Sequence, residues 1–301
     1  MMGSVLWLSL GLMIASSILP RKFGVRKLIG GVGWGMFSIH WGYQPLHYIK
    51  IQDYANVFLT IAFALFCLFI AFIMFREYRG NSTKPGKEKS LPSELSNPGT
   101  KSSMDTKSSE DMKASMDITS RLTSATALGA LVYFPFANFS YMNTWIISNV
   151  TSEVVWILQY FGVPAYAKAW NMITFNGYTV EIILACTAIE SIALFMGLIG
   201  SSVKAPPKRL IAAFIVSVPV IYILNLIRDA FVVIAYGGQW FGANSFVIAH
   251  NYIAKAGSGI ALFLISYAVL RILPELFDLI DGLWILLSEE LRNLLNRSVG
   301  D

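Results

Sequence analysis

Three residues in the C-terminal half of the chain have side chains that together could carry out chemistry on a carbonyl group. They are Cys186, Arg228 and His250, and each lies near the end of a different apolar segment. A thiolate is a nucleophile, imidazole is an acid and a base near neutral pH, and a guanidinium donates hydrogen bonds to an oxyanion. The residue types therefore fit nucleophilic catalysis, provided that the fold brings the three side chains to one place.

The composition is that of a multi-pass membrane protein. Of the 301 residues, 55% are hydrophobic and only 14% are charged, and the mean hydropathy is +0.58. In a soluble domain, about a quarter of the residues are usually charged. The composition therefore excludes an ordinary cytosolic enzyme and a disordered or fibrous protein.

The apolar runs predict an all-α polytopic protein with about seven transmembrane helices, in a range of about six to eight. The expected spans are 5–19, 28–48, 54–75, 122–139, 182–203, 210–236 and 253–273. The Trp-rich stretch 145–161 is expected either to lie in the membrane interface or to extend the span before it.

A change of composition divides the chain. The segment between Arg79 and Arg121 is rich in Ser, Lys, Pro and acidic residues and contains no aromatic residue, so it has too little apolar surface to form a core. We expect four parts: an N-terminal three-helix membrane unit (1–79), a flexible cytoplasmic linker (80–121), a catalytic membrane unit (122–275) and a cytoplasmic tail (276–301). The tail mixes acids with Leu, Ile and Trp at helical spacing, which predicts an amphipathic helix at the interface or a short structural anchor.

Basic residues set the expected orientation. The loops 21–27 and 204–209, the linker and the tail hold most of the 23 Lys and Arg residues. By the positive-inside rule, these parts lie in the cytoplasm, and the N-terminus and the three reactive residues lie on the outer side. The same bias accounts for the net charge of +5 without nucleic-acid binding.

Each candidate has an expected role. Cys186 is expected in the first turns of an inward-running helix that begins near Ile182, where the helix dipole favours a thiolate. Arg228 would stabilise the oxyanion or orient the thiolate. His250 would accept the thiol proton and return it to a leaving amine.

Neighbouring polar residues are expected to support them. Asn225 precedes Arg228 by one helical turn and would brace its guanidinium, and Glu190 follows Cys186 by four residues and would offset the charge of Arg228. Asp229 is expected to point about 100° away from Arg228.

Other candidates carry less chemistry. Cys67 lies within an apolar run and is interpreted as a small core residue. His40 and His47 are either a metal-binding pair or part of an aromatic belt, and the belt is the default interpretation because no carboxylate accompanies them. No nucleotide or metal motif is present, so the sequence predicts neither a cofactor nor a metal site.

Three motifs carry a resemblance. The stretches ACTAIE at 185–190, NLIRD at 225–229 and AHNY at 249–252, which includes Asn251, resemble the exosortase/archaeosortase family in their order and outer placement. The match covers roughly 122–275. The segment 32–56 further resembles the archaeosortase A branch of that family.

The resemblance implies a membrane-embedded cysteine transpeptidase in the archaeal cytoplasmic membrane, with its active site facing outside. Members act on secreted proteins, S-layer glycoproteins among them, that end in a Pro-Gly-Phe motif, a transmembrane helix and a basic tail. The cysteine forms a thioester, which a membrane lipid amine resolves. Some members use Arg as the third residue, but Arg271 is expected at the cytoplasmic end, so the role falls to His250.

Other interpretations remain open. The segment 163–181, with Trp170 and Tyr178, would bind the sorting motif or form an interface belt. A cysteine protease that only hydrolyses the signal would have the same residues. A scaffold would need none of the three reactive residues, and a transporter would place charges at the bilayer midplane, where this sequence is apolar.

Overall fold

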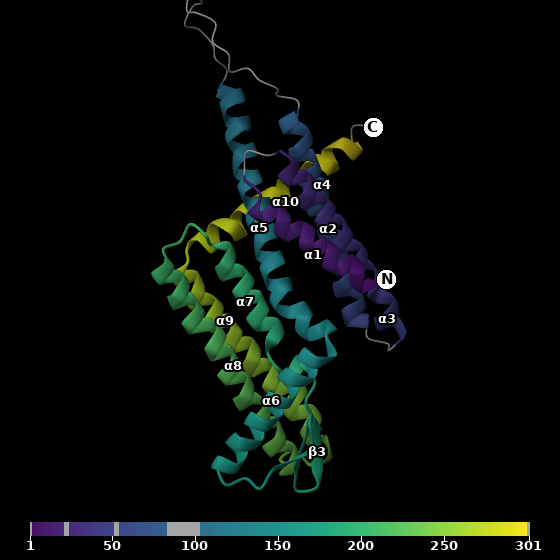
Figure 1. Cartoon of the computed structure of the whole chain (residues 1–301), viewed down its shortest axis with the longest axis vertical. Coiled ribbons are helices and arrows are strands. Elements are labelled where there is room, and N and C mark those ends of the chain that lie inside the picture. The colour runs from purple at the N-terminus through teal and green to yellow at the C-terminus, as the bar shows by residue number, and fades with distance from the viewer. Residues whose placement is uncertain (1, 21–23, 51–53, 83–102, 300–301) are drawn as a thin grey trace, which may run out of the picture. The chain divides into compact units, whose positions relative to one another are not determined.

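The computed structural model describes residues 2–20, 24–50, 54–82 and 103–299 (Figure 1). The α-helices are α1 (Met2–Ile18), α2 (Val25–Tyr43), α3 (Pro45–Lys50), α4 (Tyr54–Ser82), α5 (Ser103–Asn138), α6 (Ser140–Tyr160), α7 (Ile189–Ser201), α8 (Pro207–Gly237), α9 (Lys255–Ile272) and α10 (Glu275–Val299). Three strands, β1 (Tyr166–Ala169), β2 (Met172–Phe175) and β3 (Tyr178–Glu181), stand between α6 and α7. Short 3-10 turns form η1 (Leu184–Cys186) and η2 (Gly242–Asn244), and a π-helix forms η3 (Val247–Ala254).

The expected all-α polytopic membrane class is confirmed. Within the described ranges, three helical stretches are long and apolar enough to cross a membrane: Asn56–Gly80, Pro207–Gly237 and Val247–Ile272. The pair Ile118–Asn138 and Ser140–Tyr160 adds a fourth span if it is counted as one broken helix, and Gly3–Ile18 and Ile189–Ser201 are shorter apolar helices. The total of about seven spans stays a prediction.

Helices α5 and α6 meet at a bend of 90°. Phe139 between them has an extended backbone, with φ −99° and ψ 114°, which ends the helical hydrogen-bond ladder. Asn143 Nδ2 donates to the Phe136 carbonyl oxygen at 2.9 Å, and Asn138 Nδ2 donates to the Phe134 carbonyl oxygen at 3.1 Å. These side chains bond backbone carbonyls near the break, which an apolar surrounding requires. The stretch expected at 145–161 is therefore a helix of its own.

The chain forms two compact units, one of Met1–Ala127 with Asp278–Asp301 and the other of Leu128–Phe277. In the first unit, a buried ion pair joins α2 to α4, because Lys27 Nζ lies 2.7 Å from Glu77 Oε2 and both side chains are at most 5% exposed. Thr119 of α5 donates to the same carboxylate oxygen at 3.0 Å. Buried charges are tolerated only when paired in this way.

The expected parts of the chain correspond to this structure as follows. Of the linker 80–121, residues 80–82 end α4 and 103–121 belong to α5, and residues 83–102 lie outside the described ranges. The tail forms the helix α10, most of which belongs to the first unit. Its place at a membrane interface and the flexibility of the linker stay predictions.

The second unit contains a feature that the sequence analysis did not predict, a three-stranded antiparallel sheet in the order β1-β2-β3. The turn between β2 and β3 is Asn176-Gly177, and both residues have positive φ, 50° and 82°. An Asn-Gly pair is the strongest short-range signal of a β-hairpin, because this turn requires φ above zero at both positions. Most of the segment 163–181 therefore forms this antiparallel sheet.

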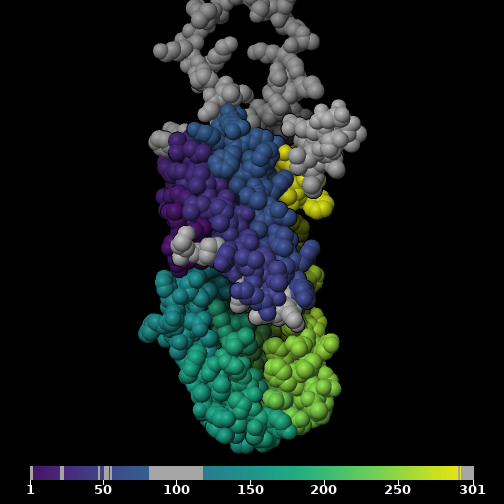
Figure 2. Space-filling view, turned by 90° about the vertical axis from the view of Figure 1, so that its right-hand side faces the viewer, coloured from purple at the N-terminus to yellow at the C-terminus, as the bar shows by residue number. Residues whose placement is uncertain are grey.

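Helices α7, α8 and α9 pack side by side, with the sheet at the C-terminal end of α8 (Figure 1). The core that α6 and α8 share with the sheet and η1 contains Val150, Val154, Ile173, Val233 and Cys186. The surface of this unit is hollowed between the teal part that includes α6 and the yellow-green part that includes η3 and α9 (Figure 2).

Close packing of the hairpin against α8 yields a test. A Cβ at Gly237 would contact the Phe175 ring and come within 2.8 Å of the Phe175 carbonyl oxygen, a contact that neither backbone can relieve. We expect Gly237→Ala to lower the free energy of unfolding by about 1–3 kcal/mol, measured by thermal unfolding in detergent. Gly259→Ala is the control, because nothing lies within 4 Å of a Cβ there; equal stability of the two variants would contradict this packing.

Candidate active site

Cys186 is the last residue of η1, in the segment that leads from β3 to α7. Ile182 N–H donates to the Asn171 carbonyl oxygen at 2.7 Å and prolongs the hairpin by one pair. Ala188 has φ 58°, so it is left-handed and α7 begins only at Ile189. The expectation that Cys186 lies in the first turns of a helix is wrong, because hairpin pairing and the left-handed residue delay the helix.

Asn225 of α8 anchors this segment. Its Nδ2 donates to the carbonyl oxygen of Cys186 at 2.7 Å and to Asp229 Oδ2 at 3.3 Å, and Asn225 is buried. The same helix therefore holds both the backbone of the cysteine and the carboxylate of Asp229. Asn225 was expected to brace Arg228, and it acts on Arg228 through Asp229.

Asp229 is the ion-pair partner of Arg228. Arg228 Nε and Nη2 donate to Asp229 Oδ1 at 3.1 Å and 2.8 Å, and the Asp229 side chain is 4% exposed. The expectation that Asp229 points away is wrong, because the 100° between neighbours describes Cα–Cβ directions and the long arginine side chain bends back. The opposite charges of the neighbouring residues Arg228 and Asp229 were the sequence signal that could have predicted this ion pair.

The electrostatics of the thiol favour its neutral form. Cys186 lies outside the candidate spans and is 8% exposed, and this burial raises the pKa of the thiol above its ordinary value. A hydrogen bond with the backbone of Ile183 lowers the pKa, the charge of Asp229 raises it, and the charge of Arg228 and a hydrogen bond from its side chain lower it. Arg228 therefore lies at the thiol and favours its ionisation against the effect of burial.

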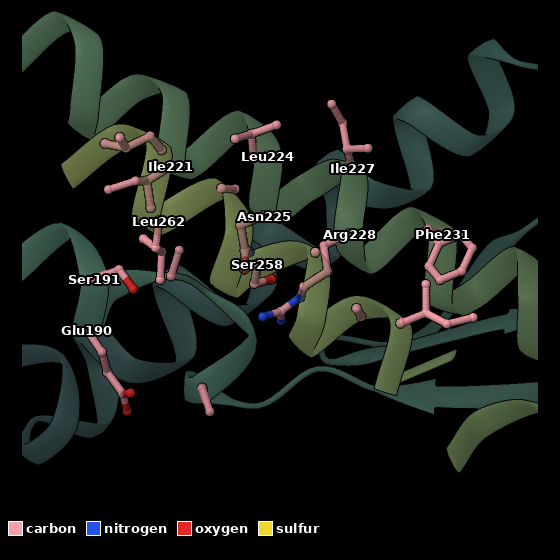
Figure 3. Close-up of a pocket in the computed structure, with 17 residues that line it drawn as sticks. Glu190, Ser191, Ile221, Leu224, Asn225, Ile227, Arg228, Phe231, Ser258 and Leu262 are labelled. Carbon is pink, nitrogen blue, oxygen red and sulfur yellow. The ribbon is translucent and has the colours of Figure 1, made fainter. Parts of the chain in front are cut away.

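A cavity of about 390 Å³ opens beside these residues, between the start of α7, α8 and the η3–α9 segment (Figure 3). Its polar lining residues are Glu190, Ser191, Asn225, Arg228 and Ser258. The apolar lining residues are Ala185, Ala188, Ile221, Leu224, Ile227, Phe231, Ile253, Ala254, Gly257, Ala261, Leu262 and Ile265. The cavity thus reaches the residues on both sides of Cys186, and Arg228 points into it from α8.

Glu190 lies across this cavity from Arg228 (Figure 3). It is exposed, stands in the first turn of α7 and accepts a long hydrogen bond, 3.5 Å, from the Tyr133 hydroxyl. Asp229 supplies the carboxylate that pairs with Arg228, and Glu190 is a second carboxylate among the residues that line the cavity.

His250 lies in η3, the π-helix that precedes α9. Its ring stacks on Phe246, with centroids 5.2 Å apart, and its Nδ1 lies 3.0 Å from Asn251 Oδ1. An amide oxygen only accepts hydrogen bonds, so Nδ1 is the donor in this contact, and in the neutral tautomer that carries this proton Nε2 is the acceptor. Within the described ranges, neither Cys186 nor Arg228 is among the groups that contact His250. Its assignment stays a prediction.

The remaining candidates are not among the residues that line the cavity. The Tyr178 ring contacts the Tyr236 ring at 5.1 Å, and Trp170 is half exposed in the turn between β1 and β2. His40 stacks on Phe37 in the first unit, while the side chain of His47 is outside what the structure describes. Among the described residues, no three of His, Cys, Asp and Glu are grouped as a metal site.

The comparisons with known proteins concern the same part of the chain. The model of the transmembrane exosortase family, Exosortase_EpsH, matches residues 115–271, just over half of the chain. Archaeosortase A of Haloferax volcanii is 36% identical over 135 residues, which cover 38% of this chain and 44% of that protein. Archaeosortase A of Natronomonas pharaonis is 24% identical over 192 residues, which cover 54% of this chain and 61% of that protein.

The matched regions thus span less than two thirds of the length of either relative. No solved structure matches the chain.

Because Arg228 lowers the pKa of the Cys186 thiol, its replacement should change the pH at which this thiol ionises. In a Cys67→Ala background, Arg228→Gln removes the positive charge that lowers the pKa of Cys186, while the charge of Asp229 that raises this pKa stays, so the pKa of the thiol should rise. The midpoint of Cys186 alkylation against pH should move upward, and the rate below the midpoint should fall about tenfold for each pKa unit. Arg271→Gln, in the last turn of α9, is the control; a midpoint that stays or moves down with Arg228→Gln would contradict the arrangement.

Proposed function

The chain belongs to the transmembrane exosortase family, and on this premise we propose that it is a membrane-embedded cysteine transpeptidase with Cys186 as nucleophile. The observation that carries the proposal is that two residues of α8 act on Cys186. Asn225 bonds its carbonyl oxygen at 2.7 Å, and Arg228, one helical turn further along α8, lowers the pKa of its thiol. A structural cysteine in a membrane protein needs neither contact.

In the first half-reaction, the thiol proton passes to His250 Nε2 and the sulfur attacks the carbonyl carbon of the scissile peptide bond. Arg228 donates hydrogen bonds to the oxyanion of the tetrahedral intermediate. The carbon–nitrogen bond then breaks, the leaving amine takes the proton from His250, and a thioester remains on Cys186. The proton transfer requires His250 and the thiol to come within hydrogen-bond reach in the substrate complex, as catalytic pairs often do.

In the second half-reaction, a membrane phospholipid amine attacks the thioester. The carbon–sulfur bond breaks, an amide forms, and the sulfur regains a proton. The burial of Cys186 supports transfer over hydrolysis, because limited access of water protects an acyl-enzyme. A cysteine protease that only hydrolyses the signal is the alternative, and the products distinguish the two.

The proposed substrates are secreted proteins with a C-terminal Pro-Gly-Phe motif, a transmembrane helix and a basic tail, S-layer glycoproteins among them. The names of both relatives, archaeosortase A, support this choice. The substrate helix would reach the site laterally from the membrane, with the site on the outer face of the archaeal cytoplasmic membrane. Trp170 and Tyr178, which both lie in the sheet segment before η1, are the proposed contacts for the Pro-Gly-Phe motif.

The two cysteines provide a matched pair for the test of this function. Cys186→Ala is expected to abolish processing of a secreted reporter with this signal, so that the reporter keeps its tail and gains no lipid, as read by the mass of its C-terminus. Cys67→Ala, a fully buried position of α4 in the first unit, should process the reporter like the wild type. Continued processing by Cys186→Ala would refute nucleophilic catalysis and favour a scaffold or transport role.

The role of His250 has a separate test. His250→Gly should lower the rate of tail cleavage by about 10²- to 10⁴-fold, the usual contribution of a general acid–base, and added imidazole should restore part of it. Asn251→Ala should give a smaller loss, because it removes only the acceptor of the Nδ1 proton. Cleavage by His250→Gly within twofold of the wild-type rate would remove His250 from the mechanism.

A further inference from the structure

The cavity beside Cys186 combines two opposite charges with apolar walls. Arg228 and Glu190 line it from α8 and α7 (Figure 3), and its apolar lining includes Ile221, Leu262 and Ile265. Its lining helices α8 and α9 belong to stretches apolar enough to cross a membrane. A ligand that fits this lining has an apolar chain and carries both a positive and a negative group.

The two charges have hydrogen-bonding capacity left for a ligand. A guanidinium has five N–H donors, and Arg228 uses one on Nε and one on Nη2 for Asp229. Its remaining donors can bind the anionic group of a ligand. Glu190 is an exposed residue that lines the cavity, and its bond from Tyr133 is 3.5 Å long, so its carboxylate can accept hydrogen bonds from a cation.

We propose that this cavity binds a phospholipid with a primary amine in its head group, with the phosphate on Arg228, the ammonium on Glu190 and one chain along the apolar wall. The inference rests on the proposed function and identifies the site of its acceptor. The cavity borders Ala185 and Ala188, which flank the nucleophile, so the bound amine lies next to a thioester on Cys186.

The size of the cavity favours a lipid over the hydrophobic helix of a sorting signal. Its volume of about 390 Å³ lies within the range of small-molecule sites. A transmembrane helix is about 10 Å across and about 30 Å long, so it needs a much larger groove. A hydrophobic helix also has no ammonium to place on Glu190.

Glu190 then has a chemical task. The ammonium of the lipid gives one proton to the Glu190 carboxylate, and the neutral amine attacks the thioester carbonyl carbon. Collapse of the tetrahedral intermediate breaks the carbon–sulfur bond, the amide nitrogen loses its second proton to the sulfur, and Cys186 is regenerated as a thiol. Glu190 releases its proton to water, which completes the balance.

The experiment uses the full chain in vesicles that hold equal amounts of phosphatidylethanolamine and phosphatidylcholine. Lipid bound to the purified protein is identified by native mass spectrometry, and the ratio of lipid-linked to hydrolysed reporter is measured in the same vesicles. Glu190→Gln is compared with Glu181→Gln, an exposed glutamate of β3 that bonds Asn171 and does not line the cavity.

We expect the wild type and Glu181→Gln to retain phosphatidylethanolamine over phosphatidylcholine. Glu190→Gln should lose this preference, and its ratio of lipid-linked to hydrolysed product should fall at least about tenfold, a change of about 1.4 kcal/mol. Unchanged lipid preference and product ratio in Glu190→Gln would overturn the inference. Displacement of bound lipid by a peptide that contains only the hydrophobic helix of the signal would also overturn it, by assigning the cavity to the helix.

Failure of the proposed function gives a different result. If Cys186→Ala still cleaves the reporter, nucleophilic catalysis fails while the lipid preference of the wild type remains measurable. If the wild type only hydrolyses the reporter in every vesicle, the proposal of transfer to a lipid is wrong. The measurement of bound phosphatidylethanolamine then still shows whether the cavity is a lipid site.

Discussion

The hydrogen bond from the Asn225 amide to the Cys186 carbonyl oxygen determines where the reactive thiol can lie. Cys186 stands on a short turn between a strand and a helix, and such a segment has no regular backbone ladder of its own. The buried amide ties it to α8 at 2.7 Å, and the second donor of the same amide holds Asp229. Because Asp229 holds Arg228 in turn, one helical turn of α8 positions the nucleophile and the group that stabilises its charge.

Burial and charge oppose each other at this thiol. Burial raises its pKa and keeps it protonated in the absence of substrate, while Arg228 favours the thiolate. A nucleophile that is mostly neutral at rest fits an enzyme that must avoid side reactions and become activated when a substrate and a base arrive. The apolar cavity next to it serves the same end, since a lining with few polar groups admits an amphiphile more readily than water.

The π-helix η3 and the hairpin surround this arrangement in the same unit. π-Helical turns occur frequently at functional sites, and η3 carries His250 and leads into the residues that line the cavity. The hairpin packs on the end of α8 through Gly237 and Phe175 and delivers the chain to η1. Both features fix the ends of the helices near the reactive groups. The apolar faces of these helices alone would not fix the positions of these groups.

The sequence by itself determined the membrane class, the identity of Cys186 and Arg228 as candidates, and the pairing of Asn225 with their neighbourhood, because composition and one-turn spacing are local properties. The sheet at 166–181 could also have been predicted from Asn176-Gly177, but the aromatic residues around it fit a motif-binding segment and an interface belt equally well. Only the tertiary structure decided that Cys186 lies before the start of α7, that Asp229 pairs with Arg228, and that Glu190 lines the cavity. These outcomes depend on hydrogen bonds between segments distant in the chain and on side-chain bending, and helical periodicity describes neither.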